Sequence, residues 1–143
     1  MGPLLDTDSY PGTDNEAFDR DHAGVGGYTS GDLLAWFEAG ALDGVPVADA
    51  VLLGIGGNDL TGGSVLIPEV VANIQSIIDF FQASNPNVTV FVEQIAPPLS
   101  TAPPSLHEKV VLLNTALLAV PPEQSTASSH VALIDMATEW MDG

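Results

Sequence analysis

The chain has 143 residues, of which 45% are hydrophobic and 6% aromatic, and its mean hydropathy is +0.27, so two ordinary domains and a wholly disordered chain are excluded. The 19 acidic residues are opposed by two basic ones, Arg20 and Lys109, and the formal charge is −17. Nucleic acids and anionic membrane surfaces are therefore disfavoured as partners, because two cations cannot neutralise a run of phosphates.

Residues 1–28 hold no periodic apolar pattern, and we expect them to form mostly loop. Six acidic residues lie between Asp6 and Asp21. A calcium loop is one interpretation of this cluster, but its fifth position is Tyr10, and Gly12 comes one place too late for an EF-hand. The pattern favours a solvated acidic loop, and the sequence predicts no metal site.

A helix is predicted to begin at Thr29 or Ser30, since either side chain can cap it and Asp32 follows in the first turn. Gly40 can end this helix. Residues 49–55 form a short continuous apolar run, which predicts a strand buried on both faces.

Two helices and two strands follow in alternation. The first of these helices has apolar residues at three- and four-residue spacing, and the second is expected to stop at a pair of prolines. Both strands are rich in β-branched residues. The predicted elements are a helix from Leu66 to Phe81 with Pro68 in its first turn, a strand at 88–92, a helix from about 104 to 120 ended by Pro121 and Pro122, and a strand at 131–135.

This alternation implies parallel βαβ units and places the chain in the α/β class. Three strands make a thin parallel sheet, because both faces of such a sheet need cover. We therefore expect one partial domain over residues 1–143, from which further elements of the fold are missing.

The loop from Gly54 to Gly63 follows the first predicted strand, at the end where parallel sheets bind ligands. A dinucleotide loop is disfavoured, because Asp59 replaces the third glycine and the next helix is predicted several residues later. The side-chain amide of Asn58 can stabilise an oxyanion at this position. The alternative is that Asn58 and Asp59 only cap the turn through local Asx hydrogen bonds, and the spacing alone favours that alternative.

A second glycine-rich segment lies one βα step earlier, directly before the first predicted helix. Residues 21–29 read DHAGVGGYT, and residues 51–59 read VLLGIGGND. Together they resemble the SGNH (GDSL-type) hydrolase family over residues 15–135, and the first segment is closest to carbohydrate esterases that remove acetyl groups from polysaccharides. The resemblance implies a three-layer α/β/α sandwich with a parallel, flavodoxin-like sheet, and ester hydrolysis through a serine acyl-enzyme without a cofactor or metal.

The resemblance assigns the oxyanion hole to two residues: Gly27 donates its backbone N–H and Asn58 its side-chain amide. The family's nucleophile and base have no such match. Ser9 lacks the apolar strand and the glycine that precede the family's serine, and no Asp-x-x-His segment occurs near the C-terminus. The three histidines are expected beside the Gly27 segment, on a surface helix and at the start of a strand: His22, His107 and His130.

We therefore expect a fragment of an SGNH-type ester hydrolase that carries oxyanion donors but is inactive alone, with a small-molecule or carbohydrate ester as substrate. A non-catalytic domain that binds acyl or carbohydrate ligands is the alternative, and an acidic calcium-dependent module is a third hypothesis. If the family's strand order holds, the missing first strand would pair beside the Val51 strand, and its absence leaves an unpaired edge for self-association.

The cellular compartment is left open by the sequence. Cysteine is absent, which excludes disulfides, thiolate zinc sites and a cysteine nucleophile. Residues 1–6 have neither the basic nor the apolar region of a signal peptide, and no apolar run approaches the roughly 18 residues of a membrane span. We expect the intact parent protein to be secreted.

Overall fold

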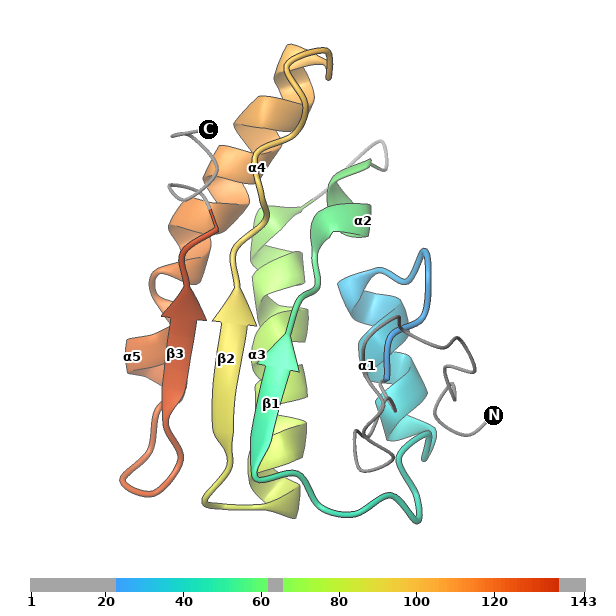
Figure 1. Cartoon of the computed structure of the whole chain (residues 1–143), viewed down its shortest axis with the longest axis vertical. Coiled ribbons are helices and arrows are strands. Elements are labelled where there is room, and N and C mark those ends of the chain that lie inside the picture. The colour runs from blue at the N-terminus through green and yellow to red at the C-terminus, as the bar shows by residue number, and fades with distance from the viewer. Residues whose placement is uncertain (1–22, 62–65, 137–143) are drawn as a thin grey trace, which may run out of the picture.

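The computed structural model describes residues 23–61 and 66–136. Helices and strands alternate along this part of the chain, as predicted (Figure 1). None of the helices it describes is both long and apolar enough to cross a membrane. The elements are α1 (Ser30–Glu38), β1 (Ala50–Leu53), α2 (Gly57–Thr61), α3 (Ile67–Ser84), β2 (Thr89–Glu93), α4 (Pro104–Leu117), α5 (Val120–Gln124) and β3 (Val131–Ile134).

The three strands form one parallel sheet in the order β1-β2-β3. Val51 of β1 is level with Val90 of β2, and Val90 is level with Val131 of β3. α2 and α3 lie between β1 and β2 in the chain, and α4 and α5 lie between β2 and β3. This topology confirms the α/β class and the parallel βαβ units.

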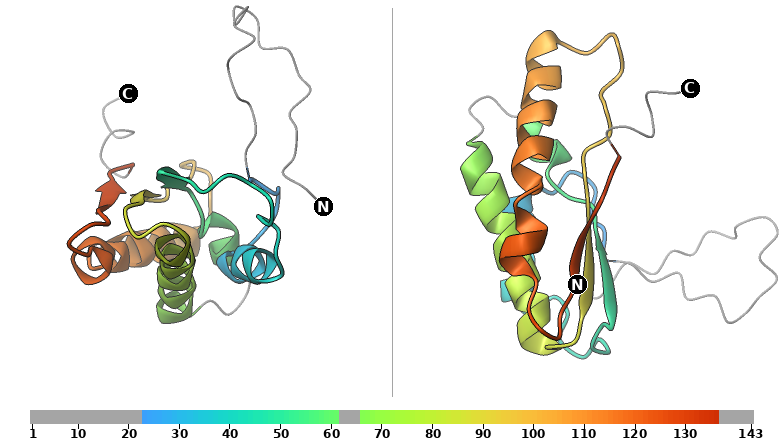
Figure 2. Two further views of the ribbon diagram at one scale, coloured as in Figure 1. Left: turned by 90° about the horizontal axis from the view of Figure 1, so that it is seen from below. Right: turned by 90° about the vertical axis from the view of Figure 1, so that its left-hand side faces the viewer.

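All the described helices lie on one face of the sheet (Figure 2). Strand side chains alternate between the two faces, and those that point towards the helices, such as Val90 and Val92, are buried. On the opposite face, Leu52 is 65% exposed and Phe91 is 38% exposed. The prediction that the strand at 49–55 is buried on both faces is therefore wrong for the described part of the chain, because helices cover only one side of it.

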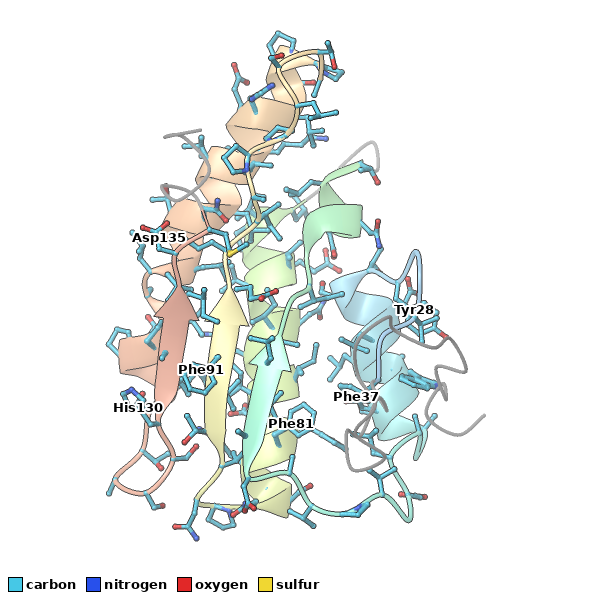
Figure 3. The ribbon with its side chains drawn as sticks, viewed as in Figure 1. Tyr28, Phe37, Phe81, Phe91, His130 and Asp135 are labelled. Atoms are coloured by element: carbon cyan, nitrogen blue, oxygen red, sulfur yellow. The ribbon has the colours of Figure 1, made fainter. Side chains whose placement is uncertain are left out.

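The core lies between the sheet and the helices. The aromatic ring of Phe37 in α1 packs on two rings of α3, with 5.5 Å between its centroid and those of both Phe80 and Phe81. This contact fixes α1 beside α3 (Figure 3). The fully buried aliphatic side chains are Ile74, Ile77, Ile78, Val88, Val90, Leu113, Leu117 and Val120.

A capping box sets the start of α1. The Thr29 hydroxyl accepts a hydrogen bond from the Asp32 N–H at 3.2 Å, and the Thr29 N–H donates to the Asp32 carboxylate at 3.0 Å. Gly40 follows the last turn with φ +87°, a conformation that favours glycine. The predicted start and end of this helix are both confirmed.

Two local predictions are wrong. A short helix, α2, begins at Gly57, immediately after the loop that follows β1, whereas the next helix was predicted only near residue 66. Pro121 and Pro122 lie in the first turn of α5, while α4 has already ended at Leu117. Prolines fit a first turn because the N–H groups there have no partner within the helix.

Candidate active site

Two glycine-rich segments from distant parts of the chain meet beside β1. Gly27, in the loop that leads into α1, and Asn58, in the first turn of α2, line the same cleft of about 430 Å³. The apolar walls of this cleft come from α1, β1 and α3, and include Leu33, Leu53 and Phe81. None of its lining residues in the described part of the chain carries a charged side chain. The cleft therefore suits an uncharged acyl group better than an ion.

The backbone of Gly27 lines this cleft. Its φ is +85°, so the backbone conformation favours glycine. Among the described residues, no hydrogen bond is made by the Gly27 N–H. Nothing lies within 4 Å of the position where a Cβ would stand, so the space beside the glycine is open.

Asn58 is held by a neighbour of Gly27. Its Nδ2 donates to the backbone oxygen of Tyr28 at 2.9 Å. A primary amide has two N–H donors, so this bond orients the side chain and leaves one donor for a ligand. The Asn58 side chain therefore does more than cap its own turn, because its amide bonds the segment before α1.

Asp59 also reaches across to α1. Its two carboxylate oxygens accept hydrogen bonds from the N–H and the hydroxyl of Ser30, at 2.8 and 2.6 Å. Ser30 is fully buried, and its hydroxyl also accepts from Nδ2 of Asn73 at 3.1 Å. The sequence analysis gave Asp59 only a local capping role, because nothing in the spacing shows that residues 29 positions apart are partners.

A second cleft of about 350 Å³ opens at the carboxyl ends of the strands, and Asn58 lines it as well. Glu93 and Gln94, at the end of β2, form part of its wall. Below it, buried Asn114 of α4 bonds both backbone groups of Ile95, accepting from the N–H and donating to the oxygen at 2.8 Å each. These residues could not be predicted from the sequence, because no motif marks them.

Neither of the two described histidines, His107 and His130, lines this cleft. His130 and Asp135 lie at opposite ends of β3 (Figure 3), and His130 is at the amino end, away from Asn58. His107 lies on α4, as predicted. Ser9, His22 and the acidic loop from Asp6 to Asp21 lie outside the described residues. The pair Asp19 and His22 does have Asp-x-x-His spacing, but near the N-terminus, and it too lies outside them.

Within residues 23–61 and 66–136, no three acidic or histidine side chains gather in a way that would hold a metal ion.

The carboxylate of Asp32 predicts a pH dependence of stability. Hydrogen bonds from the side chain and backbone of Thr29 hold the pKa of Asp32 below its ordinary value. Because the Asp32 carboxyl has a lower pKa in the folded chain than in the unfolded chain, its charge stabilises the fold at pH values above the unfolded-state pKa. This stabilisation is lost as the pH falls through the pKa of the folded state. We expect Asp32→Asn to destabilise the protein at about pH 7, and the difference from wild type to shrink as the pH falls below the ordinary Asp value of 3.8.

Urea unfolding of both proteins over this pH range measures the effect. A difference between the two proteins that persists unchanged in acid would show that the charge of Asp32 does not act in this way.

Together, the fold and the site define an α/β domain with a parallel sheet and an uncharged cleft beside β1. The model of the GDSL-like Lipase/Acylhydrolase family matches residues 7–143, and the chain belongs to this family. The resemblance of the two glycine-rich segments to SGNH hydrolases is thereby confirmed. The comparison with curated proteins finds no significant match.

Two solved structures are similar to the chain. A carbohydrate esterase family 3 protein from Talaromyces cellulolyticus is 26% identical, with a TM-score of 0.72 over 87% of this chain and 57% of its own. A mutant acetyl esterase determined with an acetate ion is 25% identical, with a TM-score of 0.74 over 90% of this chain and 59% of its own. The chain thus spans less than two thirds of the length of either structure.

Proposed function

We propose that this chain forms the oxyanion-binding part of a serine ester hydrolase that acts on acetyl or other short carboxylic esters of carbohydrates. The observation that carries the proposal is the meeting of Gly27 and Asn58 in one uncharged cleft. The similarity to a carbohydrate esterase and an acetyl esterase supports the substrate class.

In this mechanism a serine hydroxyl attacks the acyl carbon and passes its proton to a histidine, and the carbonyl oxygen becomes an oxyanion. The N–H of Gly27 and the second amide hydrogen of Asn58 donate to that oxygen. Neither donor carries a charge, so the stabilisation comes from dipoles that are already oriented before the reaction. The chain alone is expected to be inactive, because it holds no match to the family's Gly-Asp-Ser segment or to its C-terminal Asp-x-x-His segment.

The charge of the chain also fits an uncharged ester. At a formal charge of −17, an anionic substrate would be repelled before it reached the cleft, whereas an acetylated sugar would not. The acetate product is an anion, and the same repulsion would favour its release.

Titration of the isolated chain with acetate, followed by ¹H–¹⁵N NMR at high salt, tests the site. The carboxylate oxygen of acetate takes the place of the acyl oxygen, so the Gly27 amide and the Asn58 side-chain amide should shift together. The shifts should be lost in Asn58→Ala, and hydrolysis of 4-nitrophenyl acetate should stay at background. Shifts confined to other residues would contradict the proposed site.

A non-catalytic acyl-binding domain is the second candidate, because the uncharged cleft lined by Gly27 and Asn58 would hold an acyl oxygen without any nucleophile. Both candidates predict acetate binding. They differ once the chain is joined to a Gly-Asp-Ser strand and an Asp-x-x-His segment, because only the hydrolase then gains serine-dependent turnover.

We also propose that two copies of the chain associate through β1 and the uncovered face of the sheet. In the described structure β1 pairs with one strand only, and exposed Leu52 and Phe91 lie side by side on that face. Repulsion between two chains of charge −17 opposes this contact, so the dimer should form as salt screens the charges.

Sedimentation velocity should show a monomer at low salt and a dimer at about 1 M salt, where the Debye length is about 3 Å. Leu52→Glu should abolish the dimer. Leu118, on α4's end, is 60% exposed, so Leu118→Glu is a matched control that should leave the dimer intact. A monomer at every salt concentration would contradict this proposal.

A further inference from the structure

The loop before α1 and the first turn of α2 are joined by a reciprocal set of hydrogen bonds. Asn58 bonds Tyr28, and the next residue, Asp59, bonds Ser30 through both of its carboxylate oxygens. Gly27 immediately precedes Tyr28 in the chain. These bonds form one clasp of residues 28, 30, 58 and 59, which contains one oxyanion donor of the proposed function, Asn58, and directly follows the other, Gly27.

The strongest bonds of this clasp belong to Asp59. The Ser30 N–H is one of the first-turn N–H groups that α1 itself cannot satisfy. A carboxylate that accepts from such a group also lies favourably at the positive end of the helix dipole. The bond from the Ser30 hydroxyl, at 2.6 Å, joins a side chain with 0% exposure to the half-buried carboxylate of Asp59.

The rest of α2 has few other attachments. It has five residues, and Leu60 is its buried side chain. At its end, Nζ of Lys109 donates to the Leu60 oxygen at 3.2 Å. Without Asp59, the hydrogen bonds of the described residues would join the first turn of α2 to the α1 segment only through the amide of exposed Asn58 and the oxygen of Tyr28.

We propose that Asp59 is a positioning residue, which fixes the Gly27 N–H and the Asn58 amide relative to each other by bonding α2 to the start of α1. The role of those two donors rests on the proposed function. The clasp itself does not, and its effect on the two groups can be measured without catalysis.

Asp59→Ala is the informative variant, and Asp32→Ala is its control. Both aspartates lie in the first turn of a helix and accept two hydrogen bonds at the start of α1. Asp32 bonds only Thr29 within its own capping box, whereas Asp59 connects two elements. Alanine keeps the helix propensity high in both cases.

The measurement is the ¹⁵N order parameter of the Gly27 amide and of the Asn58 side-chain amide. In wild type and in Asp32→Ala, we expect the rigid value of about 0.85 for both groups, and in Asp59→Ala we expect both to fall below about 0.6. Amides of β2 should stay rigid in all three proteins, which shows that the fold is kept.

Two results would overturn the proposal: unchanged order at Gly27 and Asn58 in Asp59→Ala, or equal loss of order in Asp32→Ala. If Asp59→Ala does not fold, Ser30→Ala takes its place. This variant removes the hydroxyl that bonds Asp59 and keeps the backbone N–H that also bonds it, so it should loosen the same two groups by a smaller amount. A rigid site that binds no acetate would refute the proposed function and leave the clasp standing, while a loose site that still binds acetate would do the reverse.

Discussion

Replacing Asn58 by alanine should lower kcat by about 10²–10³-fold in a polypeptide that joins this chain to the family's serine and histidine segments, the effect expected for loss of one oxyanion donor. The amide bonds the substrate oxygen most strongly once that oxygen is negative, so kcat should fall while KM changes little. The Tyr28 oxygen would lose its partner, but this bond is exposed, so water can replace it.

Steady-state hydrolysis of an acetylated sugar measures this effect. Asn87→Ala is the control, since Asn87 is an exposed asparagine beside the amino end of β2, away from the cleft, and its loss should leave kcat unchanged. A rise in KM alone, with kcat unchanged, would show that Asn58 contributes to binding of the substrate in its ground state and not to stabilisation of the oxyanion.

Replacing Ile77 by alanine should have the largest effect on stability. This side chain of α3 has 0% exposure and belongs to the core beneath the sheet. Removing such a side chain costs about 2–5 kcal/mol, because the apolar contacts are lost and a cavity remains. The free energy of unfolding of a small domain is itself about 5–15 kcal/mol, so a substantial part of it should disappear.

Urea denaturation followed by circular dichroism gives this difference. Leu118→Ala is the control. The Leu118 side chain is 60% exposed, so its removal should change the free energy of unfolding by less than about 0.5 kcal/mol. If Ile77→Ala proves too unstable to purify, Ile77→Val should still lose about 0.5–1.5 kcal/mol. Equal effects of the two alanine variants would mean that the core is packed differently from the structure.

The sequence was sufficient for the elements whose signals are local. The capping residues Thr29 and Asp32 identified the start of α1, Gly40 its end, and the apolar spacing identified α3. The alternation of strands and helices was sufficient for the α/β class. Each of these features depends on residues within one or two turns of one another.

Features that depend on distant residues were not predictable. Leu52 is apolar, so the sequence could not show that it lies on an uncovered face. Asp59 has the spacing of a local cap, and only the fold reveals that its partner is Ser30. The meeting of Gly27 and Asn58 was anticipated by resemblance to a family, while the clasp that joins their neighbours was not.

The position of β2 between two parallel neighbours has a consequence for folding. Every strand pair in this sheet is separated along the chain by at least one complete helix, so no pairing can begin with a short hairpin. A long loop must close before the first strand contact forms, and such non-local topologies fold slowly. While α3 is still forming, β2 has neither neighbour in place, and the newly made polypeptide then exposes the side chains of Val90 and Val92, which are buried in the folded chain.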